Sequence, residues 1–267
     1  VNVCPYVFVP AEEGKEESAI NIVFQPNEHY YRGKALTEEV QFIEISAAKK
    51  INGIVNNKID LTDVSMTKKV GKNIADAGVS STVFNVPSYG YIGINANLVN
   101  VNGDADSKAS VNLRKAFATL YSAYREEFID IYYGGNAAVV DYPVSNASWA
   151  APNKEDKGYE TAYATGVDGK AIYTEDMSFE EKYAAAKMAA LEYFKAAGYT
   201  VENDVVLSAP YGAAMEFEVI ITGNSLGEHP AYMTLLHSKA ALAELGINLV
   251  IKDVTDENEM RQALEEG

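Results

Sequence analysis

The sequence has few of the residues that would tie a protein together covalently or place it in a membrane. Its 267 residues include a single cysteine, Cys4, so no disulfide can form within the chain. No apolar run approaches the roughly 20 residues that a membrane-spanning helix needs. The first residues, VNVCPYVFVP, lack the basic and apolar regions of a signal peptide, so Cys4 is not read as a lipid-anchor cysteine. We interpret both ends as cuts through a longer protein.

Positive charge is also scarce. Lysine and arginine number 22 against 38 aspartates and glutamates, which gives a formal net charge of -16. Binding to phosphate backbones needs clustered basic side chains, so no nucleic-acid partner is expected. The same deficit argues against docking on an anionic lipid surface through a basic patch. The charge therefore predicts a soluble, self-repelling surface.

Residues that bind metals do not gather in a recognisable pattern. The histidines His29, His229 and His237 are scattered, and no acidic partner completes a ligand set beside them. Asp104 and Asp106 are spaced as in a calcium loop, but the required glycine and the distal glutamate are missing. The sequence predicts neither a metal nor another cofactor.

Motifs that build catalytic centres are missing as well. The chain contains no Gly-x-Ser-x-Gly, no phosphate-binding loop and no Gly-x-Gly-x-x-Gly. The stretches YGYIG and YYGGN contain glycines but lack both the lysine and the strand–turn–helix setting. We therefore expect a protein that is not an enzyme.

The first part of the chain predicts short strands followed by short helices. Strands are expected at 6–9, 20–24 and 39–45, the first two joined by the charged stretch PAEEGKEESA. Helices are expected at 46–55, with Ser46 as a candidate N-cap, and at 67–77. The stretch STVFNVPSYGYIGIN then predicts one or two strands broken at a proline.

The second part predicts alternating helices and strands after a long helix at 110–134. An irregular segment, 134–176, separates that helix from a second one that begins with a Ser178–Glu181 capping box. The apolar stripe of this second helix is expected to anchor it to a sheet and comprises Phe179, Tyr183, Ala186, Ala190, Phe194 and Ala197. Strands MEFEVIITG and NLVIKDV alternate with helices PAYMTLLHSKAALAEL and TDENEMRQALEEG. This order is typical of an α/β fold with largely parallel strands.

Several phrases resemble the oligopeptide-type cluster of extracytoplasmic solute-binding proteins of ABC importers, known as solute-binding protein family 5. The phrase NIVFQPNEHYYRGKALTEEVQFIEI resembles a strand–turn–strand of that family, and CPYVFV resembles its Gly-Pro-Tyr strand entry. On that basis Tyr30 and Tyr31 are expected to pack on a surface turn in which Gly33 allows a positive φ.

The second half continues the resemblance in the same order. Arg114, Ala116 and Arg125 match the family's Val-Arg-x-Ala helix and its later Asp-Arg-x-x-Ile phrase. Here the spacing is about two residues longer than usual, and Tyr124 stands where aspartate would be. The stretches KYAAAKMAALEYFKAAGY and LAELGINLVIKDV match the family's Ala-Gly-Tyr helix and its Ile-Gly-Ile strand entry. About six phrases lie in register, none of them diagnostic alone.

The resemblance implies a class II periplasmic-binding-protein-like α/β fold in which two lobes with mixed sheets close over a solute. Residues 1–96 would form the C-terminal portion of lobe 1 with a crossing strand, and residues 97–267 the N-terminal two-thirds of lobe 2. Only part of each lobe would then be present, so we expect that this segment alone does not bind solute normally.

Tyrosines are the expected ligand contacts, because the chain has 18 tyrosines and their rings suit wet clefts with one apolar wall. In the predicted crossing strand SYGYIGINAN, alternate side chains face the cleft, and a core or hinge-packing role is the competing interpretation. The predicted contacts are Tyr89, Tyr91 and Asn95 there, with Tyr142, Trp149 and Tyr159 in the long loop. For the loop residues the alternative is packing of the loop itself.

The resemblance implies an oligopeptide as solute and the membrane permease of an ABC importer as partner. A sugar, a metal chelate or haem remains open as solute, and a signalling receptor or an enzyme on the same scaffold remains open as function. Location outside the cytoplasmic membrane, with a lipid tether on the full-length protein, follows from the family alone.

Overall fold

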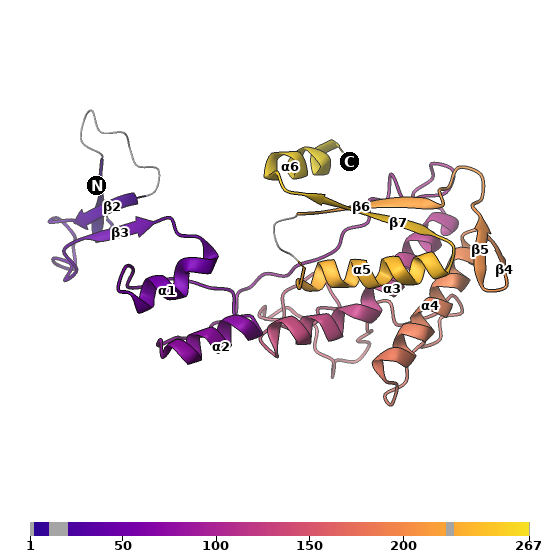
Figure 1. The fold of residues 1–267 in the computed structure, drawn as a ribbon, viewed down its shortest axis with the longest axis horizontal. Helices are drawn as coiled ribbons and strands as arrows, with labels where there is room; N and C mark the ends of the chain where they lie inside the picture. The colour runs from indigo at the N-terminus through magenta and orange to yellow at the C-terminus, as the bar shows by residue number, and fades with distance from the viewer. Residues whose placement is uncertain (1–2, 11–20, 223–226, 267) are drawn as a thin grey trace. The chain divides into compact units, whose positions relative to one another are not determined.

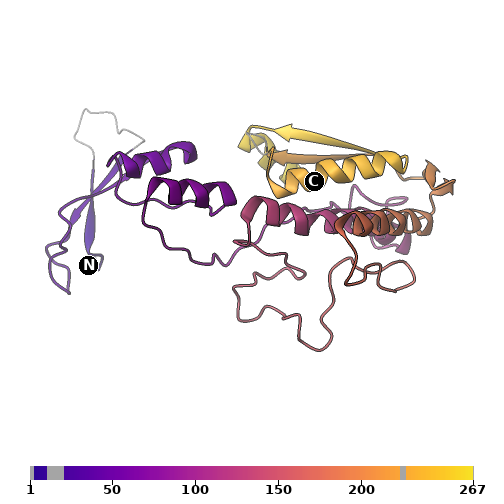
Figure 2. The same ribbon diagram turned by 60° about the horizontal axis from the view of Figure 1, so that its bottom comes forward.

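The computed structural model describes residues 3–10, 21–222 and 227–266 (Figures 1 and 2). By contacts between residues the chain divides into two compact units, one of residues 1–65 and 72–81 and the other of residues 66–71 and 82–267. The lobe boundary at residue 96 stays a prediction. The mixed α/β class expected from the sequence is confirmed.

The first unit contains a three-stranded antiparallel sheet in the order β1-β2-β3. Its strands are β1 (Tyr6–Val9), β2 (Asn21–Pro26) and β3 (Val40–Ile43). Phe8 pairs with Phe24, and the Phe24 ring lies edge-on to the rings of Phe8 and Phe42 at centroid distances of 6.0 and 5.7 Å. The predicted strands are confirmed, whereas most of the charged stretch that joins the first two lies outside the described residues.

The turn after β2 is organised by Asn27. This buried side chain donates from Nδ2 to the Cys4 carbonyl at 2.9 Å, and its Oδ1 accepts from the His29 N–H at 3.0 Å. The Gly33 N–H donates to the Tyr30 carbonyl at 3.0 Å, and Gly33 has a φ of 93°. The surface turn expected at Tyr30 and Tyr31 is present, but the packing expected of Tyr31 is wrong, since that side chain is 72% exposed.

Short helices follow the sheet. They are η1 (Ala47–Lys49), α1 (Lys50–Val55) and α2 (Lys68–Ala77). Ser46 occupies the N-cap position of η1, as expected, but its side chain makes no capping hydrogen bond. At α2 the Thr67 hydroxyl oxygen accepts from the Val70 N–H at 3.1 Å, so that threonine supplies the cap.

The second unit is built on the long helix α3 (Lys108–Tyr133), which packs against α4 (Phe179–Ala196) and α5 (Pro230–Glu244). Ser107 caps α3 by accepting from the Ser110 N–H, and Gly134 ends it at a φ of 58°. Phe117 lies at the centre of the core, with its ring centroid 4.7 Å from that of Phe217 and 5.7 Å from that of Phe194.

Helix α4 begins as the sequence predicts, because both hydrogen bonds of the Ser178–Glu181 capping box are present. Its stripe is buried from Ala186 onward, but Phe179 is 38% exposed. The expected anchorage to a sheet is wrong in its main partner: α4 packs chiefly along α3 and only secondarily on β4 (Thr200–Glu202) and β5 (Val205–Ser208). The small alanines of the stripe permit this close helix–helix packing.

The strands β6 (Glu216–Thr222) and β7 (Asn248–Val254) pair in parallel, as predicted. The crossover between them contains α5, and α6 (Glu257–Glu266) follows β7. Both views show α5 lying along the strand pair, with α3 and α4 side by side (Figures 1 and 2). Figure 2 also shows the irregular segment 134–176 on the side of α3 and α4 away from the strand pair.

The expected strand around Pro87 is wrong. No described residue from 80 to 100 belongs to a strand, and residues 81–91 are all exposed. A strand needs ladder hydrogen bonds to a neighbouring strand, and no strand among the described residues pairs with this stretch. Pro87 also removes one N–H that a ladder would use.

Candidate functional site

The stretch 89–95 presents polar side chains outward although it is not a strand. Tyr89 and Tyr91 are 43% and 83% exposed, with ring centroids 6.3 Å apart, and Asn95 is exposed. The intervening Ile92 and Ile94 are partly buried, and Ile94 packs against the main core. The predicted alternation therefore holds from residue 91 onward: Tyr91, Gly93 and Asn95 are exposed, whereas Ile92 and Ile94 are partly buried.

The C-terminal end of this stretch is fixed to α3. The Asn95 Oδ1 accepts from the Asn97 N–H at 2.8 Å, and the Asn95 carbonyl accepts from the Val99 N–H at 2.8 Å. Arg114 on α3 then donates to the Val99 and Ala105 carbonyls at 3.1 and 2.7 Å. The arginine of the family's helix phrase thus holds the segment that leads to the exposed tyrosines.

The long irregular segment is closed at its base by Asp141, whose side chain is only 4% exposed. Its Oδ1 accepts from Arg125 Nη2 at 2.5 Å and from the Ala162 N–H at 3.0 Å. Its Oδ2 accepts from the Tyr159 hydroxyl at 2.6 Å. Arg125 also donates to the Val140 carbonyl at 3.1 Å. One carboxylate therefore joins α3 to two distant parts of the same loop.

These contacts shift the pKa values of Asp141 and Tyr159. Burial pushes the pKa of Asp141 upward, but hydrogen bonds from Tyr159, from Ala162 and from Arg125 outweigh it and hold that pKa below its ordinary value. The hydrogen bond to Asp141, with smaller effects of burial, raises the pKa of Tyr159 to about 12. At neutral pH the pair is therefore an ionised carboxylate and a neutral phenol.

The predicted loop residues fall into two groups. Tyr142 and Tyr159 lie together with ring centroids 5.4 Å apart, and the Tyr142 hydroxyl accepts from the Glu160 N–H at 3.0 Å. Trp149 is 98% exposed, and within the described residues its ring makes no aromatic contact. The loop tyrosines thus pack at the base of the loop, whereas the Trp149 ring is exposed to solvent. Ligand contact by any of them stays a prediction.

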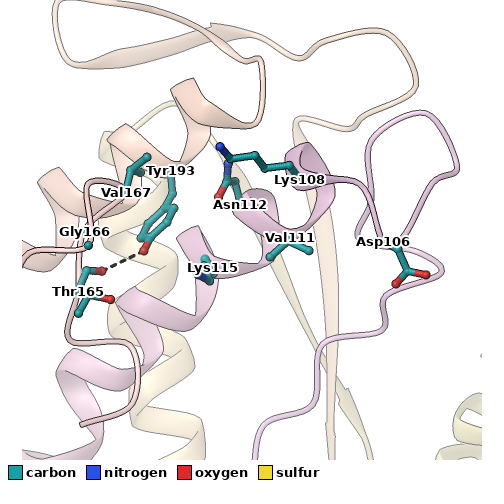
Figure 3. Close-up of a pocket in the computed structure, with 10 residues that line it drawn as sticks. Asp106, Lys108, Val111, Asn112, Lys115, Thr165, Gly166, Val167 and Tyr193 are labelled. Atoms are coloured by element: carbon teal, nitrogen blue, oxygen red, sulfur yellow. Dashed lines mark hydrogen bonds between the residues drawn. The ribbon is translucent and has the colours of Figure 1, made fainter. Parts of the chain in front are cut away.

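A surface hollow that the sequence reasoning missed lies between α3 and the turn at 165–169 (Figure 3). Its volume is about 450 Å³, and its polar lining includes Lys108, Asn112 and Lys115. The Tyr193 hydroxyl donates to the Thr165 carbonyl at 3.0 Å across one wall. Hydrophobic periodicity gives no signal for this hollow, because it depends on where an irregular loop returns to a helix.

Two negative findings apply to the part of the chain that the structure describes. No group of three or more histidine, cysteine, aspartate or glutamate side chains is placed to hold a metal ion. None of the described helices has the length and apolar character needed to cross a membrane.

Nearly the whole chain matches one known protein family. The pattern described as "Bacterial extracellular solute-binding proteins, family 5 Middle" matches residues 5–267. The chain belongs to this family. Family 5 proteins are the substrate-binding components of ABC importers, act outside the cytoplasm and deliver their ligands to the permease; they are not a family of enzymes. No curated protein matches the sequence.

Solved structures of family 5 proteins share the fold at low identity. The oligopeptide-binding protein AppA from Bacillus subtilis, in complex with a nonapeptide, is 18% identical with a TM-score of 0.56. NikA from Brucella suis, in complex with Fe(III)-EDTA, is 14% identical with a TM-score of 0.59. The substrate-binding protein CtaP from Listeria monocytogenes is 16% identical with a TM-score of 0.52.

This family 5 chain is matched almost entirely but spans less than half of those structures. The matches cover 97%, 98% and 97% of this chain for AppA, NikA and CtaP, and 43%, 45% and 42% of the respective structures. The periplasmic-binding-protein-like character expected from the sequence is confirmed at the level of fold.

Proposed function

We propose that the protein is the oligopeptide-binding component of an ABC uptake system and traps its solute between two lobes by hinge closure. The observation that carries the proposal is the family match over residues 5–267. Residues 1–96 would belong to the first lobe and residues 97–267 to the second. Its partners would be a small solute and the permease, and a lipid tether would keep the full-length protein at the membrane.

The exposed parity of the 89–95 stretch is the proposed cleft lining. Tyr89 and Tyr91 offer hydroxyl groups that donate and accept, and Asn95 offers an amide that does both. Such groups suit a peptide backbone, which presents one donor and one acceptor at nearly every residue. Most peptide side chains would remain in hydrated space, which tolerates variety in sequence. The fold similarity to AppA, whose structure holds a nonapeptide, supports this choice.

The loop residues would contribute a second wall. Trp149 is exposed and free of aromatic contacts among the described residues, so its ring is accessible to an apolar part of the solute. The Tyr142 ring packs against the Tyr159 ring and its hydroxyl accepts from the Glu160 N–H. Its proposed contact with solute would therefore involve only the rest of the ring.

A metal chelate is the second candidate solute. The fold is also similar to NikA, whose structure holds Fe(III)-EDTA, with a TM-score of 0.59 against 0.56 for AppA. A chelate of that kind carries net negative charge and would need clustered cationic groups. The peptide is favoured because the exposed 89–95 stretch contains tyrosine and asparagine without any lysine or arginine.

Native mass spectrometry of the full-length protein, purified without refolding, tests the proposal. Peptides that co-purify and exchange with added peptide are the expected result. A bound sugar, haem or metal chelate would reassign the solute class. Retention of a chemically altered product in place of the added peptide would instead indicate an enzyme.

A matched pair of variants tests the cleft lining. We expect Tyr91→Ala to weaken binding of the co-purified peptides roughly tenfold, because the minority of interface residues that cost more than about 1 kcal/mol on truncation is enriched in tyrosine, and about 1.4 kcal/mol is tenfold in affinity. Tyr211→Ala is the control, since Tyr211 is 90% exposed against 83% for Tyr91 but lies outside the 89–95 stretch. Equal effects of the two substitutions would argue that Tyr91 is an ordinary surface residue.

A further inference from the structure

The excursion between residues 143 and 158 is a closed loop with a tied neck. Asp141 joins Arg125, Tyr159 and the backbone of Ala162, as described above. A second tie runs from the Glu160 N–H to the Tyr142 hydroxyl at 3.0 Å. Sixteen residues thus leave and return at one point, which is the geometry of an Ω-loop.

The part of this loop around Trp149 is also held by successive turns. The Ser148 N–H donates to the Ser145 carbonyl at 2.8 Å, and the Ala151 N–H donates to the Ser148 carbonyl at 3.1 Å. The tryptophan lies inside the second of these turns, so its backbone is constrained although its side chain is 98% exposed. A large apolar ring is therefore held in water by a constrained backbone.

The residues on either side of Trp149 in the sequence are uncharged. Residues 143–152 read PVSNASWAAP and contain no charged side chain, in a chain with a net charge of -16. Exposed aromatic rings in neutral surroundings are typical of contact sites, because desolvating them costs no charge. The neutral tip would match an uncharged, apolar group and would offer a charged chelate nothing.

We propose that Asp141 is a positioning residue for solute recognition: it closes the loop neck so that Trp149 is presented to an apolar side chain of a bound peptide. The inference rests on the proposed function and deepens it, because it assigns the Trp149 contact to uncharged, apolar peptide side chains. Arg125 and Tyr159 act through the same carboxylate.

The neck is tested first, without any ligand, by Asp141→Asn in the full-length protein. Asparagine keeps the shape but loses the charge, and its amino group would face hydrogen-bond donors. Trypsin should then cleave after Lys154 and Lys157 roughly tenfold faster or more, because charge-assisted hydrogen bonds are lost. Asp168→Asn is the control, since Asp168 lies in the same irregular segment and pairs with Lys170 while its side chain is 58% exposed. An unchanged cleavage rate in Asp141→Asn would show that Asp141 does not close the loop neck.

The contact is tested next by the fluorescence of Trp149, which is the only tryptophan among the 267 residues of the sequence. Other tryptophans of the full-length protein are replaced by phenylalanine so that the fluorescence reports on Trp149. Two nonapeptides of alanine and serine serve as probes, one with a central phenylalanine and one with a central glutamate. The phenylalanine peptide should shift the emission to shorter wavelength and reduce acrylamide quenching, while Fe(III)-EDTA should change neither. Asp141→Asn should weaken binding of that peptide more than Asp168→Asn does.

Failures of the two proposals differ in their results. Peptide binding that leaves Trp149 emission unchanged overturns this inference and leaves the peptide function intact. Equal protection of Trp149 by both peptides overturns the preference for an apolar side chain. Absence of any peptide binding in the wild-type protein overturns the proposed function together with the role of Trp149.

Discussion

Gly246, just after α5, is constrained by its backbone conformation and by a close neighbour at the same time. Its φ is 83°, and a Cβ added there would lie 2.5 Å from the Val206 carbonyl oxygen. The Val206 N–H also donates to the Leu245 carbonyl at 2.8 Å, which fixes β5 against the end of α5. An alanine at 246 would therefore have to displace a strand that belongs to the core.

A left-handed conformation alone costs an L-residue about 1–2 kcal/mol. We expect Gly246→Ala to lower the free energy of unfolding by clearly more than that. Gly169→Ala is the matched control, because Gly169 has a φ of 78° and nothing within 4 Å of its added Cβ. Urea denaturation of both variants separates the two costs. Equal losses of stability would show that the approach of Val206 imposes no cost of its own.

The Asp141–Tyr159 pair predicts a change at alkaline pH. Because the hydrogen bond to Asp141 raises the pKa of Tyr159 from 10.0 to about 12, its contribution to stability is complete below pH 10 and is lost as the pH rises toward 12. The tyrosinate absorbance of the wild-type protein minus that of Tyr159→Phe should therefore appear late in the titration. In Asp141→Asn the same difference should move toward pH 10. A wild-type difference already centred at pH 10 would contradict the hydrogen bond.

At the residue scale the sequence predicts which side chains are accessible better than it predicts what they do. Tyr89, Tyr91 and Asn95 are on one exposed parity because the apolar Ile92 and Ile94 between them turn inward. The anchoring role of Asp141 could not be predicted, since its partners lie 16 to 21 residues away through an irregular segment. Periodicity describes helices and strands and gives no distances across a loop.

At the scale of elements, capping chemistry gives a direct comparison within one chain. Ser178 accepts from the Glu181 N–H at the start of α4, whereas Ser46 occupies the N-cap position of η1 without a side-chain hydrogen bond. We expect Ser178→Ala to lower stability by about 1 kcal/mol and Ser46→Ala to lower it by much less. Denaturation followed by helical circular dichroism measures both. Similar losses would mean that residue type at the cap, and not the hydrogen bond, sets the effect.

The elements that the sequence predicts well are those with strong local signals. Helices α3, α4 and α5 combine apolar residues with capping signals, strands β6 and β7 are short apolar runs, and all five are present. The β4–β5 hairpin was missed although Asn203 and Asp204 both have positive φ, which is typical of a two-residue hairpin turn. The strand expected around Pro87 fails for the opposite reason. Its local pattern is suitable, but pairing depends on a neighbour that local sequence cannot specify.

At the scale of the whole chain, the apolar core belongs to one of the two compact units. Every residue of the main hydrophobic cluster, from Leu113 to Leu249, lies in the second unit. Among the described residues of the first unit only Asn27, Gly53 and Ile74 are buried. The β1-β2-β3 sheet leaves Phe8 and Phe42 53% and 62% exposed, so its hydrogen bonds receive little support from apolar burial.

This asymmetry predicts unequal local stability within the 267-residue chain. Amides in the β1-β2-β3 ladder should exchange with solvent roughly a hundredfold faster than those in β6, because opening that sheet exposes little additional apolar surface. The β4–β5 hairpin is the control: it has fewer strands, but Val206 is only 2% exposed within the core, so its amides should be protected. Hydrogen–deuterium exchange with mass spectrometry resolves the three regions.

Equal protection of β1-β2-β3 and β6 would mean that ladder hydrogen bonds stabilise the first unit without a core. Protection of the first sheet that appears only in a longer form of the protein would mean that its apolar face is buried by further chain, and that its strands depend on that burial for their stability.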